Sequence, residues 1–281
     1  MARPDLSVVV VTLNARPYLE RCLESVSGYE TVVVDHGSTD GTVEVVRERF
    51  PEARLVEQEN RGLAAGWNRG MREAGGRWFL ILNADAWVVD DAVERLVNPD
   101  GTLQRSVRGF PTAWRLATEY FFLRKLAPRS RALNAFYAAR FDHASVREAE
   151  FLMGACMLVR REAADEVGPL DEDFFLFSEE TDWHFRFRAA GWQVLFYPGA
   201  EVVHVGGAGH GGRMFVEQVR GHLRFLAKHR GAAEAERARK LLLVSLRVRA
   251  AAFRGERGRM YAEAARWLAS GDVPSLLDSP R

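Results

Sequence analysis

Short apolar runs alternate with amphipathic segments along the first 90 residues of the chain. The runs at 7–12, 31–34 and 78–82 are almost continuously apolar, and a shorter run lies at 54–57. Continuous apolar runs of this length are typical of strands that are buried on both faces. Between them, apolar residues recur three and four positions apart, for example at 17–26, which indicates helices. Strands that alternate with helices predict an α/β fold with a mostly parallel sheet and right-handed crossovers.

A polar triplet closes the last of these strands. Asn83-Ala84-Asp85 follows the run at 78–82, at the strand end where open parallel sheets gather ligands. Asn83 can hydrogen-bond a sugar hydroxyl, and Asp85 can hold a hard divalent cation, which prefers oxygen ligands. A strand followed by a simple Asx turn would have the same sequence, so the triplet alone leaves both interpretations open.

The other strand ends are polar in a way that suits a nucleoside and a sugar. Their side chains include Thr12, Asn14, Asp35 and Arg61. Asp35 could accept a hydrogen bond from a pyrimidine ring, and Arg61 could reach a phosphate. The first strand-to-helix turn, TLNARPY, has no GxGxxG pattern, so it lacks the glycine cradle for the pyrophosphate of a nicotinamide or flavin cofactor.

The composition is that of an ordinary globular protein. The 281 residues are 47% hydrophobic and 27% charged, enough for one large domain or a domain with an extension. A net charge of +1 argues against nucleic acid as a partner. Cys22 and Cys156 lie in apolar patterns without zinc spacing, which predicts reduced, packed thiols in a cytosolic protein. The sequence shows neither a signal peptide nor an apolar run of about 18 residues, so we expect no membrane span.

The middle of the chain is less regular. The segment 114–141 is rich in aromatic residues and arginine. We expect an amphipathic helix pair that covers the sheet, with an acceptor-binding or membrane-surface element as the alternative. The segment 150–161 is expected to form a strand, in which Gly154 would let the backbone approach a ligand closely. From 214 onward the pattern is helical.

Six motifs in chain order resemble the inverting glycosyltransferases of family 2, most closely the bacterial rhamnosyltransferase-like branch. They are VVVVTLNARPYLERCLESV, VVVDHGSTDGT, ENRGLAAGWNRG, FLILNADAWV, the acidic group EETD at 179–182, and the strand end at His204. The resemblance implies the GT-A fold, a Rossmann-like and mostly parallel sheet flanked by helices. We expect this domain at 1–212 and a helical C-terminal extension at 213–281. Within the domain, 1–98 would bind the nucleotide sugar, and 99–212 would form the acceptor and catalytic half.

The resemblance also implies a set of site residues. Asn83-Ala84-Asp85 stands in place of the family's DXD-like element, with an amide in its first position, which leaves Asp85 as the expected metal ligand. His204 would complete a site for Mg²⁺ or Mn²⁺. The nucleotide-sugar donor would be bound by Thr12, Asn14, Asp35, Arg61, Asn68, Asn83 and Gly154. The acceptor would be a hydroxyl of a glycan or of a lipid-linked precursor.

The acidic group at 179–182 is the expected catalytic element. Inverting transfer needs one base to take the proton of the acceptor hydroxyl, whereas a glycosidase needs two carboxyl groups. We expect Glu180, which replaces the more usual aspartate, to be this base, with Glu179 as the second choice. The dipole of the helix that begins here would hold Glu180 ionised, and Asp182 could orient an arginine or the acceptor. Acids that only cap a helix are the alternative.

Three further expectations concern the surroundings of the site. The glycine-rich run 206–212 would form a lid over the donor, or a flexible connector. The arginine-rich C-terminal helices would be solvated, or would contact anionic phospholipid or an isoprenoid-diphosphate acceptor. The enzyme would be cytoplasmic, alone or with peripheral contact at the inner membrane face. A nucleotidyltransferase of similar fold and a non-catalytic nucleotide-sugar-binding scaffold are the alternative functions. The first normally has a glycine-rich, basic loop after the first strand, which TLNARPY is not.

Overall fold

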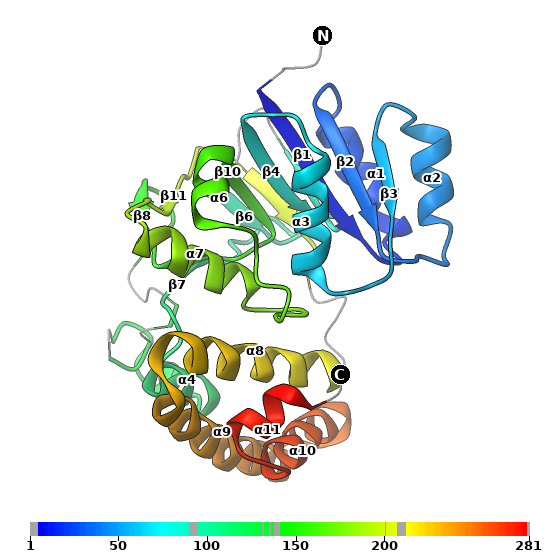
Figure 1. The fold of residues 1–281 in the computed structure, drawn as a ribbon. Helices are drawn as coiled ribbons and strands as arrows, with labels where there is room; N and C mark the ends of the chain where they lie inside the picture. The colour runs from blue at the N-terminus through cyan, green and yellow to red at the C-terminus, as the bar shows by residue number, and fades with distance from the viewer. Residues whose placement is uncertain are drawn as a thin grey trace.

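A five-stranded sheet with the order β10-β4-β1-β2-β3 is the centre of the amino-terminal part of the computed structural model (Figure 1). The structure describes residues 5–89, 95–130, 132–134, 136–137, 141–199, 201–206 and 212–279. The four predicted strands are present and parallel, and β10 adds an antiparallel edge. Their bounds are β1 Leu6–Thr12, β2 Glu30–Asp35, β3 Arg54–Glu57, β4 Trp78–Asn83 and β10 Cys156–Arg160. The mostly parallel α/β sheet predicted from the sequence is therefore confirmed.

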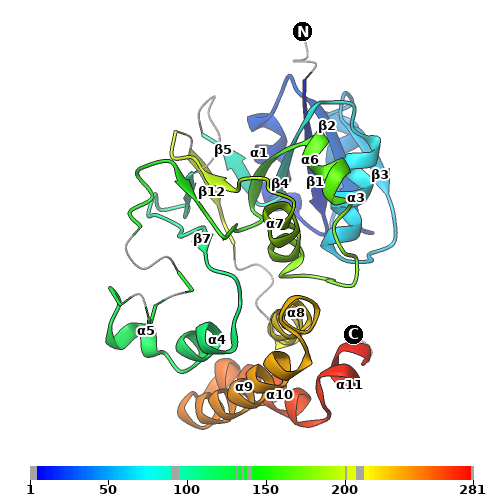
Figure 2. The same cartoon turned by 60° about the vertical axis from the view of Figure 1, so that its left-hand side comes forward.

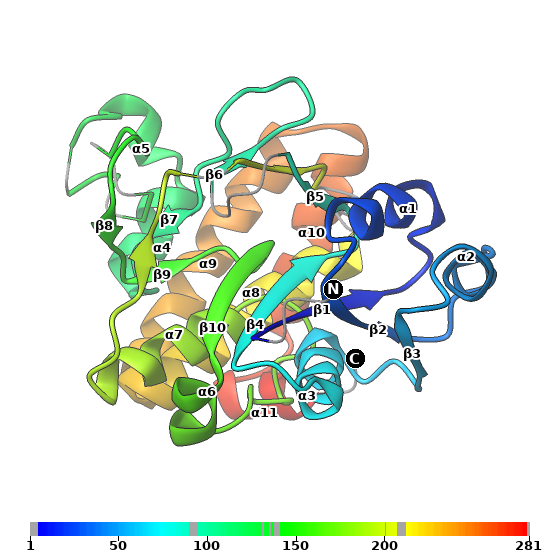
Figure 3. The same ribbon diagram turned by 90° about the horizontal axis from the view of Figure 1, so that it is seen from above.

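Helices cover both faces of this sheet because its strands are apolar on both faces. Figure 3 shows helices α1 and α2 on one side and helices α3 and α6 on the other. Val8 and Val10 of β1 belong to the core that also includes Leu19 of α1, whereas Val9 and Val11 pack with α3. The helix bounds are α1 Arg16–Ser25, α2 Thr42–Arg49, α3 Leu63–Glu73, α6 Arg161–Val167 and α7 Glu179–Ala189.

A smaller, three-stranded sheet lies beyond the end of β4. Its central strand β12 (Glu201–His204) pairs antiparallel with β5 (Ala86–Val88) and parallel with β6 (Arg95–Val97). Two short pairs complete the strands, β7 (Val107–Arg108) with β9 (Phe151–Leu152) and β8 (Arg147–Glu148) with β11 (Leu195–Phe196).

The strand expected at 150–161 differs from the observed one. It is interrupted after Leu152, and β10 begins only at Cys156, so Gly154 lies in a turn between two strands that belong to different sheets. The break allows β9 to pair with β7 while β10 joins β4.

The C-terminal residues form the expected helical extension, which Figure 2 shows as a layer apart from the sheet. Its helices are α8 Gly212–Arg230, α9 Ala232–Ala252, α10 Gly255–Ala269 and α11 Val273–Asp278. None of the helices in the described ranges is both long enough and apolar enough to cross a membrane.

The helix pair expected at 114–141 does not cover the sheet. Helices α4 (Ala113–Tyr120) and α5 (Leu123–Leu126) occupy its first part, and α4 packs on α9. The buried side chains of α4, such as Leu116, belong to the core formed by the C-terminal helices, because the apolar face of α4 packs against the apolar faces of those helices. The main chain at the end of α4 accepts hydrogen bonds from Arg249 of α9, at Tyr120 O (2.6 Å) and Glu119 O (2.9 Å). Residues 131, 135 and 138–140 of this expected pair lie outside the described part of the chain.

This second core contains residues from both sides of the boundary expected between 212 and 213. Leu116 and Phe136 share it with Leu223, Leu242 and Leu268. The acceptor half and the C-terminal extension are thus packed together, and the division at this point stays a prediction.

The loop that leads into α7 is held in a strained conformation. Phe177 and Ser178 both have left-handed backbones, with φ of 68° and 72°, which is uncommon for residues other than glycine. A Cβ atom at Gly62 would lie 2.4 Å from Phe175 O, and one at Gly221 of α8 would lie 2.5 Å from Phe177 O. Because glycines on both sides allow close packing, the loop is fixed between α3 and α8, and the start of α7 is fixed with it.

Candidate active site

The antiparallel pairing of β12 with β5 brings Asp85 and His204 together. His204 is the register partner of Ala86, and the backbone N–H of Val205 donates to Asp85 O over 3.0 Å. The N–H of Gly206 donates to Asp85 Oδ2 over 3.1 Å. As a result, Asp85 Oδ1 lies 3.4 Å from His204 Nε2, although the two residues are far apart in the chain.

Gln104 fixes the orientation of the His204 ring. Its amide Nε2 donates to Asn98 Oδ1 (3.0 Å) and to the backbone oxygen of His204 (3.1 Å). These two bonds use both N–H groups of the amide and so fix which side of it carries Oε1. The Oε1 atom lies 2.8 Å from His204 Nδ1 and can only accept a hydrogen bond, so Nδ1 must carry the proton. In the neutral ring Nε2 then carries the lone pair, and this is the atom that faces Asp85.

The Asp85 oxygen and His204 Nε2 that face each other both present electron lone pairs. A positive charge between them would therefore stabilise their close approach. Burial alone would raise the pKa of Asp85, but its contact with His204 and the N–H of Gly206 lower it, so the carboxylate is ionised. A proton or a metal ion can supply the charge. Carboxylate and imidazole, with the far ring nitrogen held by Gln104, are a ligand set that suits Mg²⁺ or Mn²⁺.

Asp85, His204 and Glu180 line one cavity of about 570 Å³, as expected from the sequence. Asn83 lies on the same wall as Asp85, and Glu179 lies beside Glu180 at the start of α7. The cavity therefore brings a candidate metal site and a candidate base into one space.

Glu179 is a buried acid, and Glu180 is a half-buried acid on the cavity wall. The pKa of each is raised, mainly because burial disfavours the carboxylate; for Glu179 the neighbouring charge of Glu180 adds to the effect. Arg108 lowers the pKa of Glu180 in part but does not reverse its rise. The Oε2 atom of each acid has no hydrogen-bond partner among the described residues. Desolvation therefore outweighs the helix dipole in setting the direction of the pKa shift, and the expectation that Glu180 is held ionised stays a prediction.

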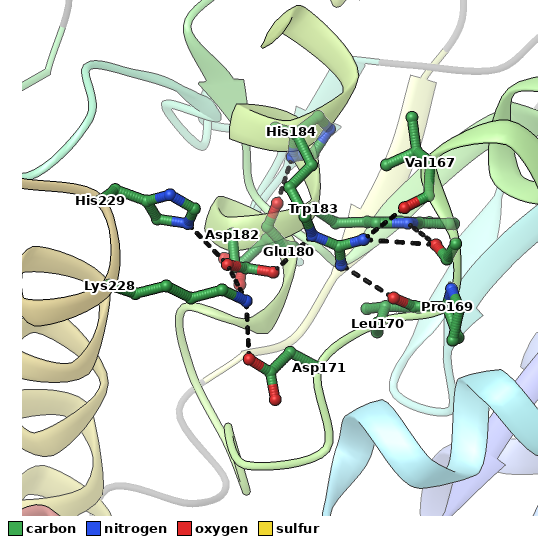
Figure 4. Close-up of polar contacts among 12 residues, drawn as sticks. Val167, Pro169, Leu170, Asp171, Glu180, Asp182, Trp183, His184, Lys228 and His229 are labelled. Atoms are coloured by element: carbon green, nitrogen blue, oxygen red, sulfur yellow. Dashed lines mark hydrogen bonds and ion pairs between the residues drawn. The ribbon is translucent and has the colours of Figure 1, made fainter. Parts of the chain in front are cut away.

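Asp182 lies away from this cavity and ties α7 to α8 (Figure 4). Its carboxylate accepts hydrogen bonds from Arg186 Nε (2.8 Å) and His229 Nε2 (2.7 Å), and Lys228 Nζ lies 2.8 Å from it. Burial alone would raise its pKa, but the bonds from His229 and Lys228, with the charge of Arg186, lower it to about 2. The structure thus places Asp182 beside an arginine, as expected, and a role toward the acceptor stays a prediction.

Five of the expected donor-binding residues do not line the cavity, and two of these bind neighbouring backbone. Asp35 Oδ1 accepts from the N–H groups of Gly37 and Ser38 at 2.9 Å. Asn14 Oδ1 accepts from the N–H of Thr39 at 2.8 Å. These bonds shape the two loops at the ends of β1 and β2, and contact with a nucleoside stays a prediction for both residues.

The other three lie at or near α3 and β1. Asn68 is buried, donates to Leu170 O over 2.9 Å and accepts from Leu170 N over 2.9 Å, so it joins α3 to the segment before α7. Arg61 forms an ion pair with Glu172 at 2.9 Å. Thr12 is buried, and its hydroxyl has no hydrogen-bond partner among the described residues. Their donor-binding roles also stay predictions.

Gly154 lines the cavity, and its lack of a side chain has a structural role that the sequence did not suggest. A Cβ atom at this position would lie 2.9 Å from Trp67 Cη2 and 3.5 Å from Glu180 Cβ. The glycine thus makes room for the indole ring of Trp67 beside the candidate base, and close approach of its backbone to a ligand stays a prediction. The glycine-rich run expected as a lid lies mostly outside the described residues, at 207–211.

Sequence reasoning missed many residues of the cavity wall, among them Trp67, Gln104 and Arg108. Trp67 belongs to the motif ENRGLAAGWNRG, so its place could have been suspected. Gln104 and Arg108 lie in the irregular stretch between β6 and β9, where no periodic pattern marks them.

Comparisons with known proteins agree with this geometry. A family model described as glycosyl transferase family 2 matches residues 7–168. The N-acetylglucosaminyl-diphospho-decaprenol L-rhamnosyltransferase of Mycobacterium tuberculosis (strain CDC 1551 / Oshkosh) is 30% identical over 233 residues, covering 71% of this chain and 75% of that protein. Glycosyltransferase GlyA of Streptococcus pneumoniae serotype 4 (strain ATCC BAA-334 / TIGR4) is 36% identical over 100 residues, covering 32% and 14%.

A solved structure supports the fold over the whole chain. The mannosyltransferase PcManGT from Pyrobaculum calidifontis, in complex with GDP-Man and Mn²⁺, matches with a TM-score of 0.53 at 19% identity. The match covers 98% of this chain and 79% of that one. At this identity the likeness shows the GT-A fold alone.

The hydrogen bonds of Gln104 predict the tautomer of His204. In EDTA, without divalent cations, ¹⁵N NMR of the neutral ring should show the proton on Nδ1 and an unprotonated Nε2. Gln104→Leu should abolish this preference, whereas Gln193→Leu, in a different pocket, should not change it. A neutral ring protonated on Nε2 in the unaltered protein would contradict the assignment.

Proposed function

The chain belongs to glycosyl transferase family 2 and is a glycosyltransferase of the rhamnosyltransferase-like branch, and we propose that it acts by inversion. The sugar would move from a nucleoside-diphosphate sugar to a hydroxyl of a glycan or lipid-linked acceptor. The observation that carries this proposal is the single cavity lined by Asp85, Glu180 and His204. A separate metal site and base would not serve one displacement.

Asp85 and His204 would hold the divalent cation. Within the described ranges they are not joined by a third acid, histidine or cysteine in a metal-binding group, so donor oxygens and water would complete the coordination. When bound, Mg²⁺ or Mn²⁺ would neutralise charge on the departing diphosphate. The presence of Mn²⁺ and GDP-Man in the PcManGT complex supports this assignment.

Glu180 would take the proton of the acceptor hydroxyl. As the oxygen of that hydroxyl forms its bond to the anomeric carbon, the bond from this carbon to the diphosphate breaks, and the proton moves to Glu180. A desolvated carboxylate with a raised pKa is a better base than an exposed one. Its unpartnered Oε2 atom is free to receive the proton, and Glu179 is the second choice.

The acceptor is best described from the chemistry of the relatives. The Mycobacterium tuberculosis enzyme is named for N-acetylglucosaminyl-diphospho-decaprenol, a sugar on a lipid diphosphate. We propose a lipid-linked acceptor here as well. Such an acceptor would bring the protein to the inner face of the membrane as a peripheral enzyme.

Glu180→Gln should lower the rate of transfer by about 10²–10⁴-fold, because the amide is no base, and should leave donor binding unchanged. Transfer can be followed with a panel of sugar nucleotides, and binding of the nucleoside diphosphate by calorimetry. Glu48→Gln, at an exposed position on α2, is the matched control and should behave as the unaltered enzyme. Normal turnover by the Glu180 variant would refute the base assignment.

The raised pKa of Glu180 predicts an acid limb in the pH profile of kcat. The base works only when deprotonated, so kcat should fall about tenfold per pH unit below a midpoint that lies above the ordinary value of 4.5. Arg108→Gln removes a charge that favours the carboxylate, so it should move the midpoint to higher pH. A midpoint at or below 4.5, or a shift in the opposite direction, would contradict this account.

A further inference from the structure

A second cavity adjoins the candidate active site. Its volume is about 570 Å³, and it shares three wall residues with the catalytic cavity, Gln104, Arg108 and Met153. The rest of its wall comes from the segment before β7, from α5 and from the residues after it. These residues are Arg105, Arg124, Lys125, Pro128, Asn134 and Tyr137.

The wall of this cavity is strongly basic. It contains four cations, Arg105, Arg108, Arg124 and Lys125, and no carboxylate among the described residues that line it. Among the described residues, Arg124 is the only one of these four that forms an ion pair, with Glu119 at 2.5 Å, and its guanidinium lies 4.7 Å from the centre of the Tyr137 ring. The cavity therefore has more positive charge than its neighbouring acid can balance.

Arg108 is placed between the two cavities. Its Nη2 atom lies 3.1 Å from the sulfur of Met153, and its guanidinium lies 4.9 Å from the centre of the Tyr137 ring. Its buried Nε atom has no hydrogen-bond partner among the described residues. A buried guanidinium N–H without a partner is costly, so this donor is available to an anionic ligand.

We propose that this basic cavity binds the diphosphate of the acceptor while the sugar on that diphosphate extends past Arg108 toward Glu180. The inference rests on the proposed function and specifies its acceptor as a diphosphate ester. Arginine pairs with phosphate oxygens through two N–H groups, and lysine adds a compact charge. In the proposed function the donor diphosphate lies beside Asp85 and His204, which line the catalytic cavity and not the basic one.

Two exposed leucines that are sequence neighbours of wall residues could contact a hydrocarbon carrier. Leu126 follows Lys125 and is 79% exposed, and Leu103 precedes Gln104 and is 37% exposed. An acceptor on a prenyl chain could cover these side chains after its diphosphate is bound. A diphosphate without a hydrocarbon chain would share the cationic contacts but not these apolar ones.

The test is direct binding of two probes, inorganic pyrophosphate and farnesyl diphosphate, measured by calorimetry in EDTA. EDTA removes divalent cations, which suppresses binding beside Asp85 and His204. The variant Arg105→Gln/Lys125→Gln should raise Kd for both probes about tenfold, since it removes two charge-assisted contacts at exposed positions. The control Arg72→Gln/Arg257→Gln removes two exposed arginines elsewhere and should leave Kd unchanged.

Tighter binding of farnesyl diphosphate than of pyrophosphate would identify the ligand of the cavity as a lipid-linked diphosphate. Equal binding of the two probes would identify it as a diphosphate without a hydrocarbon carrier. Equal Kd values for the unaltered protein and the Arg105/Lys125 variant would overturn the proposal. Hydrolysis of sugar nucleotides by the unaltered enzyme tests the proposed function separately, because diphosphate binding in EDTA does not depend on catalysis.

Discussion

The pairing of β12 with β5 is the contact on which the candidate site depends. It is an ordinary antiparallel ladder, yet its register sets His204 beside Ala86 and therefore next to Asp85. A shift by one residue would turn His204 to the other face of the small sheet. The two candidate metal-ligand atoms, Asp85 Oδ1 and His204 Nε2, come from residues more than a hundred positions apart. Backbone hydrogen bonds, rather than their own attraction, bring them to 3.4 Å.

The opposite wall of the cavity depends on close packing. At the start of α7, Glu179 is buried and Glu180 is half-buried, and desolvation raises the pKa of both. The left-handed residues Phe177 and Ser178 hold this helix start in place, because Gly62 and Gly221 let α3 and α8 approach the loop closely. Strain and buried acid are both destabilising, and the surrounding core must compensate for them. Such a combination is common where a group must be ready to exchange a proton.

Much of the donor half could be predicted from the sequence because its signals are local. Continuous valine runs identify β1 and β2, and helical spacing identifies α1. The meeting of Asp85, Glu180 and His204 was predicted from the resemblance to the family, not from local pattern.

What could not be predicted depends on contacts between distant segments. The role of Gln104 requires the fold of an irregular connector, and the packing of α4 on α9 requires the shape of helices more than a hundred residues later. The raised pKa of Glu180 could not be predicted, because a helix start normally favours a carboxylate and the desolvation that raises the pKa is visible only in the folded chain.

The most direct test of the account is anomalous diffraction from crystals grown with Mn²⁺ and a nucleoside diphosphate. The account predicts one strong manganese peak in contact with both an Asp85 oxygen and His204 Nε2, with the diphosphate beside it and Glu180 across the same cavity. A manganese ion bound elsewhere, with Asp85 and His204 directed to separate surfaces, would contradict it.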